Sequence, residues 1–551
     1  MATQAEAWWP ASREGELVDL TLGGLLAAQA QAHGARIAAV FVDGATGATT
    51  RWSFESLLAR TGLLARGLME WGVGQGDRVA VMAPNCAEWI ELEFALARIG
   101  AVLVTVNPAL RARELDYVLR QGRVGHLIHA AQFRRQDIAA MVAELVAGGT
   151  FPDLRGICAI AGEGPATVAG LAARGAALDA GALAEREARV RPHDVMQIQY
   201  TSGTTGRPKG AMLSHHSTVN NARLMAARGG FGPDDVLLSA MPLFHTAGCV
   251  CNIIGMLACG GRAVIMDGFD PAAMLAAWRD HGATVINGVP TMYARMLDHP
   301  DFAAGPARRL RIAFMGGTSI PPSLLRRLRD ATGAAPMVIM GMTECSPIIT
   351  QTDPADPFET RIATAGIPLP HTEVKIVDPA TGATLPWGAR GELCVRGYLL
   401  TRGYFDMPDK TAETIDPEGW LHSGDLAVLE RSGHLSIVGR LKDMIIRGGE
   451  NVFPVEIEDF LLEHPDVAQA QVVGVPDPDL GEEIFAFVLA APGTAPSPQA
   501  LQDHCRAGLA RHKMPKYLRV LDAFPLTPNG KVQKFALRDM ALALTKEDAP
   551  T

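Results

Sequence analysis

The residues best suited to chemistry lie in one short stretch, Tyr200 to Gly210, which reads Tyr-Thr-Ser-Gly-Thr-Thr-Gly-Arg-Pro-Lys-Gly and follows an apolar, β-prone run. Its glycines would let backbone N–H groups face an anion without a Cβ in the way, while the hydroxyls add donors and Lys209 adds charge. The stretch is not a Walker A loop, because no Ser or Thr follows the lysine. It predicts a mobile phosphate-binding loop, with a plain turn as the alternative.

Composition and charge limit the kind of partner. The chain has 551 residues, of which 48% are hydrophobic and 20% charged, with a formal net charge of -9. These proportions are typical of a globular protein. A negative chain offers no general field for nucleic acid, so any phosphate site must be local. We therefore expect a small anionic partner and no nucleic acid.

The N-terminus, the most apolar stretch and the cysteines argue against a secretory signal, a membrane helix and a zinc site. Residues 1–16 lack a basic start followed by an apolar segment, which argues against a secretory signal and predicts a cytoplasmic protein. The most apolar long stretch, residues 245–261, is shorter than the roughly 20 residues of a membrane helix and predicts a buried helix. The eight cysteines have no C-x-x-C or zinc spacing, so we expect reduced core residues.

From residue 78 onward, short apolar runs alternate with helical patterns, which is typical of βα units in a mainly parallel sheet. In such sheets ligands bind at the carboxyl ends of the strands. Glycines at 203, 316–317 and 341 each follow an expected strand, so three loops could face one crevice. The strands are expected at residues 79–82, 102–106, 127–129, 195–200, 236–240, 263–266, 285–288, 312–315 and 337–340.

The pattern changes twice in the last third of the chain. After residue 364, alternating strands and turns predict a small antiparallel β subdomain. Beyond residue 440 the pattern predicts an α+β domain of about 110 residues, large enough to fold alone. The sequence thus predicts an α/β protein with an N-terminal domain at 1–440, built on doubly wound sheets, and a C-terminal domain at 441–551.

Six motifs occur in the order found in a known superfamily. With the glycine loop as the first, the others are Pro242-Leu243-Phe244-His245, Gly341-Met342-Thr343-Glu344, Gly419 to Asp425, Gly439 to Asp443 and Pro528-Asn529-Gly530-Lys531. The chain resembles the adenylate-forming (AMP-binding) superfamily, which includes acyl-CoA synthetases, peptide-synthetase adenylation domains and beetle luciferases. Residues 85–108 also resemble its N-terminal part.

The resemblance implies a two-step reaction that uses ATP, CoA and Mg²⁺. A carboxylate attacks the α-phosphate of ATP to give an acyl-adenylate and pyrophosphate, and a thiol then takes the acyl group. We expect an acid-CoA ligase for a fatty or otherwise apolar carboxylic acid. An acyl-AMP ligase that loads a carrier protein, a luciferase-like oxygenase and a non-catalytic nucleotide-binding protein remain alternatives.

The resemblance also assigns roles to residues. Lys209 would hold the departing phosphates, Glu344 would bind Mg²⁺, Thr343 would contact the α-phosphate and Lys531 would bridge it to the acyl carboxylate. The carboxylate of Asp425 suits a ribose diol because it can accept two hydroxyl hydrogen bonds, and Arg440 would support the sugar. The full set of implied nucleotide-binding residues is Thr201, Ser202, Gly203, Thr204, Thr205, Gly206, Gly317, Thr318, Met340, Gly341, Met342, Asp425 and Arg440.

The remaining roles concern the acid and the thiol. His245 resembles a gate at the acyl entrance, and Asn287, Gly288 and Gly316 would line the acyl pocket. The C-terminal domain would be mobile about a hinge at Lys442, and the CoA arm would pass Gly448, Gly449 and Glu450.

One departure from the family concerns Met340, which stands where many members carry an aromatic residue that stacks on adenine. A methionine can still cover a ring face through its polarizable sulfur. Lys534, close to Lys531, is expected to be a surface residue, and a homodimer is an open possibility.

Overall fold

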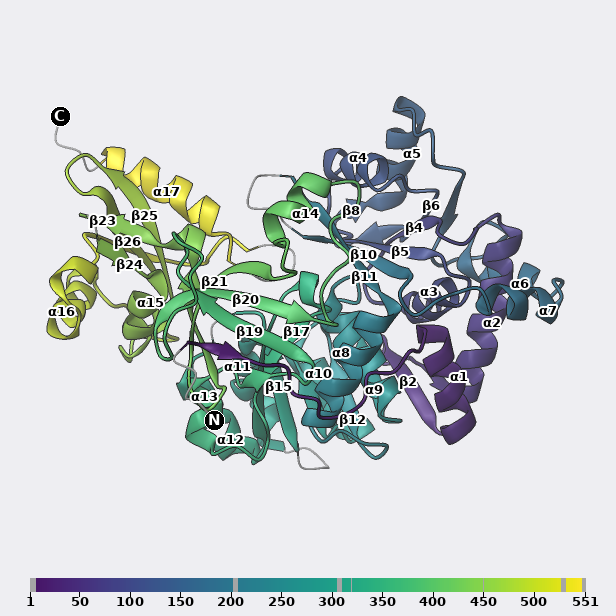
Figure 1. Cartoon of the computed structure of the whole chain (residues 1–551), viewed down its shortest axis with the longest axis horizontal. Helices are drawn as coiled ribbons and strands as arrows, with labels where there is room; N and C mark the ends of the chain where they lie inside the picture. Colours follow the sequence, from purple (N-terminus) through teal and green to yellow (C-terminus); the bar gives the residue numbers. More distant parts are fainter. Residues whose placement is uncertain are drawn as a thin grey trace. The chain divides into compact units, whose positions relative to one another are not determined.

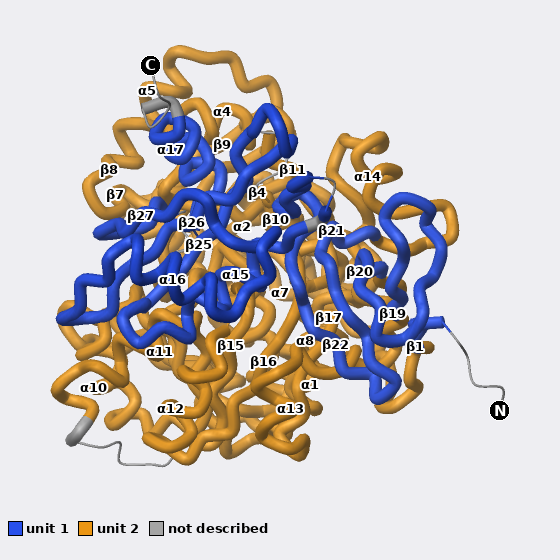
Figure 2. Tube along the Cα trace, turned by 90° about the vertical axis from the view of Figure 1, so that its left-hand side faces the viewer, with its two compact units in different colours: residues 1–9, 374–394, 422–551 blue, residues 10–373, 395–421 orange. Residues whose placement is uncertain are grey.

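The structure, a computed structural model, describes residues 6–201, 207–304, 310–318, 320–448, 450–526 and 532–547. The chain divides into two compact units (Figure 2). Unit 1 consists of residues 1–9, 374–394 and 422–551, and unit 2 of residues 10–373 and 395–421. Compact units need not coincide with domains that move separately, so the boundary at residue 440 stays a prediction.

A six-stranded sheet forms one layer of unit 2, in the order β11-β10-β5-β4-β6-β9 (Figure 1). All neighbours are parallel except β10 and β11, as the βα rhythm predicts. The strands β4 and β5 are buried over most of their length, which explains their continuous apolar sequences. Their bounds are β4 Arg78–Met82, β5 Val102–Val106, β6 His126–His129, β9 Gly156–Ala159, β10 Val195–Thr201 and β11 Lys209–Ser214.

A nine-stranded sheet has the order β18-β17-β16-β15-β14-β12-β13-β2-β3. Its central strands, from β16 to β2, are parallel, whereas β17, β18 and β3 pair in the antiparallel sense. The bounds are β2 Ile37–Val42, β3 Thr49–Ser53, β12 Val236–Ser239, β13 Arg262–Met266, β14 Val285–Asn287, β15 Ile312–Gly316, β16 Ala335–Gly341, β17 Ile348–Gln351 and β18 Ile367–Pro368. The strands predicted from the α/β pattern are therefore confirmed.

Apolar residues on the two faces of this sheet belong to two separate hydrophobic cores. Along β12, Leu237 belongs to one core cluster, while Val236 and Leu238 belong to the other. This alternation follows from the two-residue period of a strand. The second cluster contains Trp278 of α10 (Pro271–His281), whose first turn is capped by Asp270, with Pro271 in the first turn.

The other helices of unit 2 pack mainly around the sheets. The stretch predicted as a buried helix at 245–261 contains a π-helix, η1 (Ala247–Ile254), followed by α9 (Gly255–Ala258). The remaining helices are α1 Leu22–His33, α2 Phe54–Glu70, α3 Ala87–Arg98, α4 Ala112–Gln121, α5 Ile138–Gly148, α6 Val168–Gly175, α7 Ala180–Glu187, α8 His215–Arg228, α11 Pro290–Leu297, α12 Pro322–Thr332, α13 Phe358–Ala363 and α14 Pro408–Thr414.

A five-stranded sheet in the order β1-β19-β20-β21-β22 contains the predicted β subdomain and one strand that the sequence did not reveal, β1 (Trp8–Trp9). β1 pairs with β19 in the antiparallel sense. The bounds of the others are β19 Thr372–Val377, β20 Arg390–Gly397, β21 Leu421–Leu429 and β22 Leu435–Arg440. β19 and β20 each have residues in both units.

The C-terminal part of unit 1 is α+β, as predicted, with a sheet in the order β24-β23-β26-β25 and β27 beside β26. Its elements are β23 Ile445–Arg447, β24 Glu450–Val452, α15 Pro454–Leu462, β25 Val467–Asp477, β26 Gly481–Ala490, α16 Pro498–Gly508, β27 Tyr517–Leu521 and α17 Lys534–Glu547. Lys534, expected at the surface, has a side chain that is 28% exposed and forms an ion pair that the sequence did not predict. Its Nζ lies 2.8 Å from Oε1 of Glu458, a buried carboxylate that attracts it.

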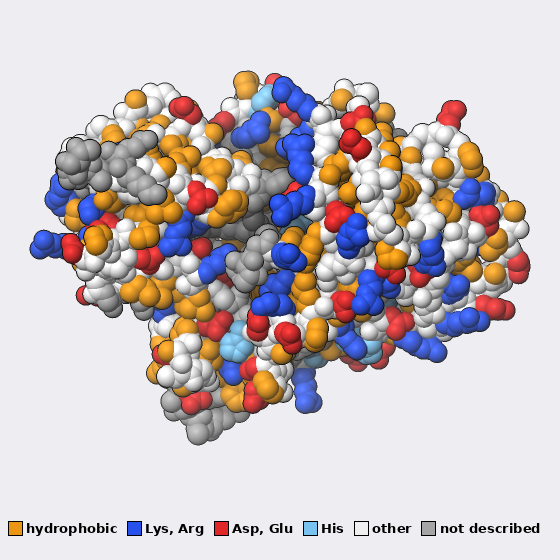
Figure 3. All heavy atoms as spheres, turned by 90° about the horizontal axis from the view of Figure 1, so that it is seen from above, with side chains coloured by type: hydrophobic (Ala, Val, Ile, Leu, Met, Phe, Trp, Pro, Cys, Tyr) orange, Lys and Arg blue, Asp and Glu red, His pale blue; other side chains and the backbone are white. Residues whose placement is uncertain are grey.

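The surface carries both signs of charge. Figure 3 shows acidic, basic and apolar side chains interspersed over one face, with a row of Lys and Arg side chains near its middle. No helix among the described residues combines the length and the apolarity needed to cross a bilayer.

Candidate active site

The carboxyl ends of four neighbouring parallel strands bring several predicted residues to one edge of the nine-stranded sheet. β12, β14, β15 and β16 are consecutive in that sheet, so their ends lie side by side. Asn287 ends β14, Gly316 ends β15 and Gly341 ends β16. Ser239, at the end of β12, donates from its hydroxyl to the carbonyl of Asn287 at 2.9 Å. The strand order places the loops after Gly316 and Gly341 at one edge, whereas β10, which precedes the glycine-rich loop, belongs to the six-stranded sheet. That all three loops face one crevice stays a prediction.

Gly341 occupies a position that has no room for a side chain. A Cβ built there would lie 2.1 Å from the carbonyl oxygen of Pro347. The pairing of β16 with β17 shifts register between Met340 and Gly341, which turns the chain toward Thr343 and Glu344. Gly317 has a φ of +81°, a conformation that favours glycine. These two glycines set the backbone path at the strand ends.

Glu344 is buried and held by a second segment of unit 2. It lies in a short 3-10 turn, Thr343–Cys345. Its backbone carbonyl accepts from the N–H of Thr401 at 2.7 Å, and its Oε1 accepts from the hydroxyl of Tyr404 at 2.8 Å. Burial, followed by the nearby Glu344 carboxylate, raises the pKa of Tyr404, so its hydroxyl stays protonated and donates.

Tyr404 also contacts the predicted phosphate-binding cation. Nζ of Lys209 lies 4.4 Å from the centroid of the Tyr404 ring. The segment around Tyr404 runs along β11, where the N–H of Met212 donates to Gly403 and that of Phe405 donates to Gly210. Tyr404 therefore connects Lys209 with Glu344, two residues far apart in sequence. Sequence reasoning missed it, because an aromatic residue outside any chemical motif has no spacing signal.

The ends of the glycine-rich loop are anchored, although Ser202, Gly203, Thr204, Thr205 and Gly206 lie outside the described residues. Thr201 ends β10 and pairs with Lys209 at the start of β11. The hydroxyl of Tyr117 donates to the carbonyl of Pro208 at 3.0 Å, and that of Tyr200 donates to Gln121 at 2.5 Å. The predicted mobility and phosphate contacts of the loop stay predictions.

Of the residues predicted for the acyl pocket, His245 and Asn287 contact η1. Nδ1 of His245 accepts from the N–H of Ala247 at 3.2 Å, at the start of that helix. Asn287 is buried and donates from Nδ2 to Oδ1 of Asn252 at 2.6 Å. Gly288 donates from its N–H to the carbonyl of Phe314, which ties β14 to β15. The gate role of His245 stays a prediction.

In unit 1, Asp425 and Arg440 face one another across β21 and β22. Nε of Arg440 lies 2.8 Å from Oδ1 of Asp425, whose side chain is 8% exposed against 52% for the arginine. Two of the residues predicted for the ribose are thus brought together. The long motifs supplied the signal for this pair, since neither residue is distinctive alone.

The residues predicted for the hinge and the CoA arm come next in the sequence, after β22. Lys442 lies in a 3-10 turn, Leu441–Asp443, after β22. Gly448 has a φ of +61° and donates from its N–H to the carbonyl of Leu480. Glu450 begins β24, and its carboxylate lies 3.4 Å from Nε2 of His512. Gly449 and Lys531 lie outside the described residues.

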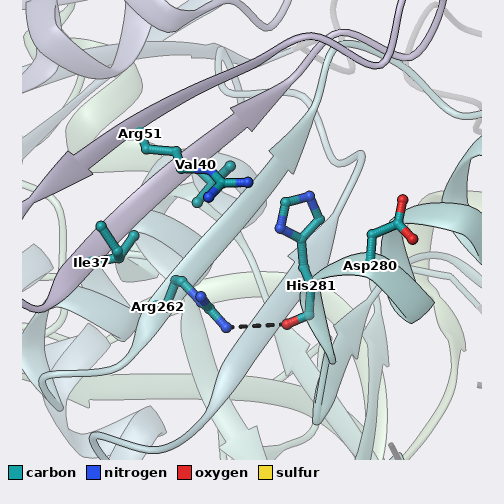
Figure 4. Close-up of a pocket in the computed structure, with 6 residues that line it drawn as sticks. All are labelled: Ile37, Val40, Arg51, Arg262, Asp280 and His281. Carbon is teal, nitrogen blue, oxygen red and sulfur yellow. Dashed lines mark hydrogen bonds between the residues drawn. The ribbon is translucent and has the colours of Figure 1, made fainter. Parts of the chain in front are cut away.

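A separate hollow in unit 2, of about 120 Å³, contains none of the predicted residues (Figure 4). Its lining residues are Ile37, Val40, Arg51, Arg262, Asp280 and His281. Arg262 donates to the carbonyl of His281 at 3.1 Å and so satisfies a carbonyl at the end of α10. The hydrogen bond from Arg262 caps the helix, and none of the residues expected to take part in the reaction lines this hollow.

Family models match most of the chain. The model of the AMP-binding enzyme matches residues 26–405, and that of the AMP-binding enzyme C-terminal domain matches residues 456–531. The chain belongs to the AMP-binding enzyme family.

Similar proteins in other organisms are named as acyl-CoA synthetases or acyl-CoA ligases. This AMP-binding enzyme is 39% identical over 547 residues to YngI of Bacillus subtilis, named as an acyl-CoA synthetase, covering 96% of this chain and 98% of the relative. It is 36% identical over 493 residues to the mitochondrial medium-chain acyl-CoA ligase ACSF2 of Danio rerio, covering 86% and 81%.

Solved structures agree with the sequence relatives. The anthranilate CoA ligase AuaEII, in complex with anthranoyl-AMP, superposes with a TM-score of 0.83 at 25% identity, covering 97% of this chain and 99% of that one. ATP-bound MatB from Rhodopseudomonas palustris superposes with a TM-score of 0.80 at 29% identity, covering 95% and 100%. The predicted fold and the prediction of an AMP-forming acyl-CoA ligase that uses ATP and CoA are confirmed at the level of the family.

Proposed function

We propose that this AMP-binding enzyme joins a carboxylic acid, predominantly apolar in its chain, to CoA through an acyl-adenylate. The observation that carries the proposal is the connection of Lys209 to Glu344 through Tyr404, beside the strand ends that hold Gly316 and Gly341. A cation and a carboxylate held together by one ring suit a site where anionic phosphates and their counter-ion are bound.

The first half-reaction brings two anions together, so it needs positive charge and N–H donors where charge develops. An oxygen of the substrate carboxylate attacks the α-phosphorus of ATP, the bond to the β-phosphate oxygen breaks, and pyrophosphate leaves. Lys209 and the loop from Ser202 to Gly206 would hold the departing phosphates. Thr343 would contact the α-phosphate, and Lys531 would bridge it to the incoming carboxylate.

Glu344 fits a role in holding Mg²⁺. Mg²⁺ prefers carboxylate and phosphate oxygens, and a carboxylate has more acceptor capacity than the single hydrogen bond from Tyr404 to Oε1 uses. When bound, the ion would neutralise charge on the phosphates. The buried position and the fixed orientation of Glu344 would keep the carboxylate ready for it.

Asp425 and Arg440 would hold the ribose, and Gly317, Thr318, Met340, Gly341 and Met342 would border the nucleotide. Because Arg440 already contacts Oδ1 of Asp425, it can orient that carboxylate for a diol. These roles concern the part of ATP that stays on the enzyme after pyrophosphate leaves.

In the second half-reaction, the sulfur of CoA attacks the acyl carbonyl carbon and AMP leaves. No nucleophile from the enzyme is needed, because the adenylate is already activated and a thiol with a pKa near 8.5 is partly ionised. A rotation about Lys442 would withdraw Lys531 and present Gly448, Gly449 and Glu450 to the thiol arm. His245 would gate the acyl entrance beside Asn287 and Gly288.

Acid-dependent exchange of pyrophosphate into ATP tests the proposal. A panel from acetate to long-chain and aromatic acids should reveal at least one active acid, with formation of its CoA thioester seen by mass spectrometry. Exchange without a thioester from free CoA would favour loading of a carrier protein, and no exchange with any acid would favour a non-catalytic nucleotide-binding protein. The cytoplasmic location and a homodimer stay predictions.

A further inference from the structure

A buried group of polar side chains in unit 2 is not used by the proposed reaction. We call it the inner polar group: Glu93 of α3, Gln197 and Gln199 of β10, and Cys249 and Asn252 of η1. Glu93 is 2% exposed, while Gln197 and Asn252 are fully buried. Such residues are rarely placed in a core unless they have hydrogen-bond partners.

Some polar atoms of the inner polar group contact one another, and others have no hydrogen-bond partner among the described residues. Nε2 of Gln199 lies 3.4 Å from Sγ of Cys249 and 3.5 Å from Oε1 of Gln197. Among the described residues, no partner is found for either carboxylate oxygen of Glu93, for Nε2 of Gln197 or for Nδ2 of Asn252. Each unpaired buried polar atom costs about 1–3 kcal/mol, which points to a missing partner.

Contacts join Gln197, Gln199 and Glu93 around Cys249, while Asn252 is joined to Asn287. Gln197 and Gln199 are two residues apart on β10, so they point to the same face of the strand. Cys249 and Asn252 are three residues apart on η1, which begins directly after His245. Glu93 lies near enough to Cys249 to add, after burial, to the rise in the pKa of that thiol.

The inner polar group continues from the residues proposed for the acyl pocket. Asn287 donates to Oδ1 of Asn252 at 2.6 Å, and His245 stands at the start of the helix that carries Asn252. An acyl chain that enters past His245 and Asn287 would therefore approach unpaired amide donors before it reaches a purely apolar core.

The unpaired atoms define the chemistry of the partner. Nε2 of Gln197 and Nδ2 of Asn252 are donors and need an acceptor. Burial raises the pKa of Glu93 to about 8, so at neutral pH it is mainly a neutral acid with an O–H donor and a carbonyl acceptor. A hydroxyl can accept from the amides and donate to the Glu93 carbonyl, whereas a ketone could not satisfy that carbonyl.

We propose that the acid accepted by this enzyme carries a hydroxyl on an otherwise apolar chain, and that Glu93, Gln197 and Asn252 select it. This inference rests on the proposed function, because it places the acyl chain beside Asn287. The expected substrate is then an acid whose apolar chain carries one hydrogen-bonding group, rather than an acid whose chain is wholly apolar. Ordered water in place of the hydroxyl is the competing explanation.

The test compares straight-chain acids of equal length, either unsubstituted or with one hydroxyl at each successive carbon. Pyrophosphate exchange gives kcat/KM for each acid. We expect at least one hydroxylated acid to exceed its unsubstituted partner by about 10-fold or more, because the unsubstituted acid leaves buried polar atoms unpaired. A preference for the unsubstituted acid at every position would overturn the inference and favour buried water.

Substitutions test which side chains produce the preference for the hydroxylated acid. Gln197→Leu and Asn252→Leu should each lower the ratio of hydroxylated to unsubstituted acid by about 10-fold, mainly by reducing kcat/KM for the hydroxylated acid. Gln351→Leu is the matched control, because Gln351 is a buried glutamine of β17 outside the group, and it should leave the ratio unchanged. A ratio that all three variants leave unchanged would contradict the assignment.

Binding without catalysis separates this inference from the proposed function. The thermal unfolding temperature of the wild-type chain should rise more with the preferred hydroxylated acid than with its unsubstituted partner. If exchange fails with every acid but this difference is seen, the proposed reaction is wrong and the hydroxyl site stands. If exchange occurs and the two acids give equal shifts and equal rates, only the hydroxyl site is wrong.

Discussion

The hydroxyl of Tyr404 donates to Oε1 of Glu344 at 2.8 Å, and the ring of the same tyrosine lies 4.4 Å from Nζ of Lys209. Tyr404 is therefore a positioning residue for two groups of the proposed site. Its contribution can be separated into the hydroxyl, which orients the carboxylate, and the ring, which contacts the cation.

Tyr404→Phe should reduce the rate of adenylate formation by about 10- to 100-fold, because a hydrogen bond to a charged group contributes about 1.5–3 kcal/mol. The ring contact to Lys209 would be kept. The measurement is pyrophosphate exchange as a function of Mg²⁺ concentration, and a higher Mg²⁺ requirement is expected.

Tyr398→Phe is the matched control, since Tyr398 is a tyrosine of unit 2 whose hydroxyl lies 3.4 Å from Nδ2 of Asn221. It should leave the Mg²⁺ requirement unchanged. Equal Mg²⁺ requirements in wild type and Tyr404→Phe would show that the hydroxyl does not position Glu344.

Gly341→Ala should lower both stability and adenylation. The new Cβ would lie 2.1 Å from the Pro347 carbonyl oxygen, so the backbone must move, at a cost of about 1–3 kcal/mol or more. Gly268→Ala is the control, because nothing lies within 4 Å of a Cβ built there. Thermal unfolding and exchange rates should separate the two variants, and an active, stable Gly341→Ala enzyme would contradict the close approach.

Glu93→Gln should change how stability depends on pH. Burial raises the pKa of Glu93 from 4.5 to about 8 and lowers that of His215 from 6.5 to about 4. Between pH 6.5 and 8, the folded chain keeps the Glu93 proton that the unfolded chain has lost, so the free energy of unfolding falls as pH rises. The slope is at most about 1.4 kcal/mol per pH unit.

Below pH 6.5, His215 acts in the opposite sense, because the unfolded chain binds a proton there that the folded chain does not. Denaturant unfolding of wild type and Glu93→Gln should therefore be compared between pH 6.5 and 8. The variant should lose the decline seen in the wild type, and parallel curves would show that Glu93 is ionised in the folded state.

Lys531→Ala should depress adenylate formation far more than thioester formation from supplied acyl-adenylate. Lys534→Ala is the neighbouring control: Lys534 pairs with Glu458, so its loss should lower the unfolding temperature without separating the two half-reactions. If Lys531→Ala lowered the rates of both half-reactions equally, the proposed rotation of the C-terminal domain about Lys442 would be wrong.

Asp425→Asn should raise the KM for ATP more than it lowers stability. The amide keeps the shape of the side chain but loses the charge that attracts Arg440 at 2.8 Å and that would accept two ribose hydroxyl bonds. Exchange measured against ATP concentration gives the effect, with 2′-deoxy-ATP as the comparison. If the variant and the wild type discriminate equally against the deoxy nucleotide, the ribose assignment is wrong.

Local sequence patterns predicted the parallel strands, because the burial of such a strand shows in its own continuous run of apolar residues. The motifs singled out Asp425 and Arg440 for one role, and the structure brings the two side chains within 2.8 Å of each other, while the ribose role itself stays a prediction. These features have a short-range signal that survives without knowledge of the fold.

Long-range contacts had no such signal. Tyr404 meets Glu344 only because residues 401–405 run along β11, and Lys534 meets Glu458 only because α17 folds back on its domain. The inner polar group could not be assembled either, since Glu93, Gln197 and Asn252 lie on three separate elements. Each depends on how distant segments pack, which periodicity and spacing do not encode.

The pairing of β1 with β19 affects the order in which the protein can be built. Trp9 pairs with Val374, so most of unit 2 is synthesised before the partner of the N-terminal strand leaves the ribosome. At about 5–20 residues per second, the nascent N-terminus would wait roughly 20–70 s with its two tryptophans unpaired. For that time β1 has no strand with which to pair.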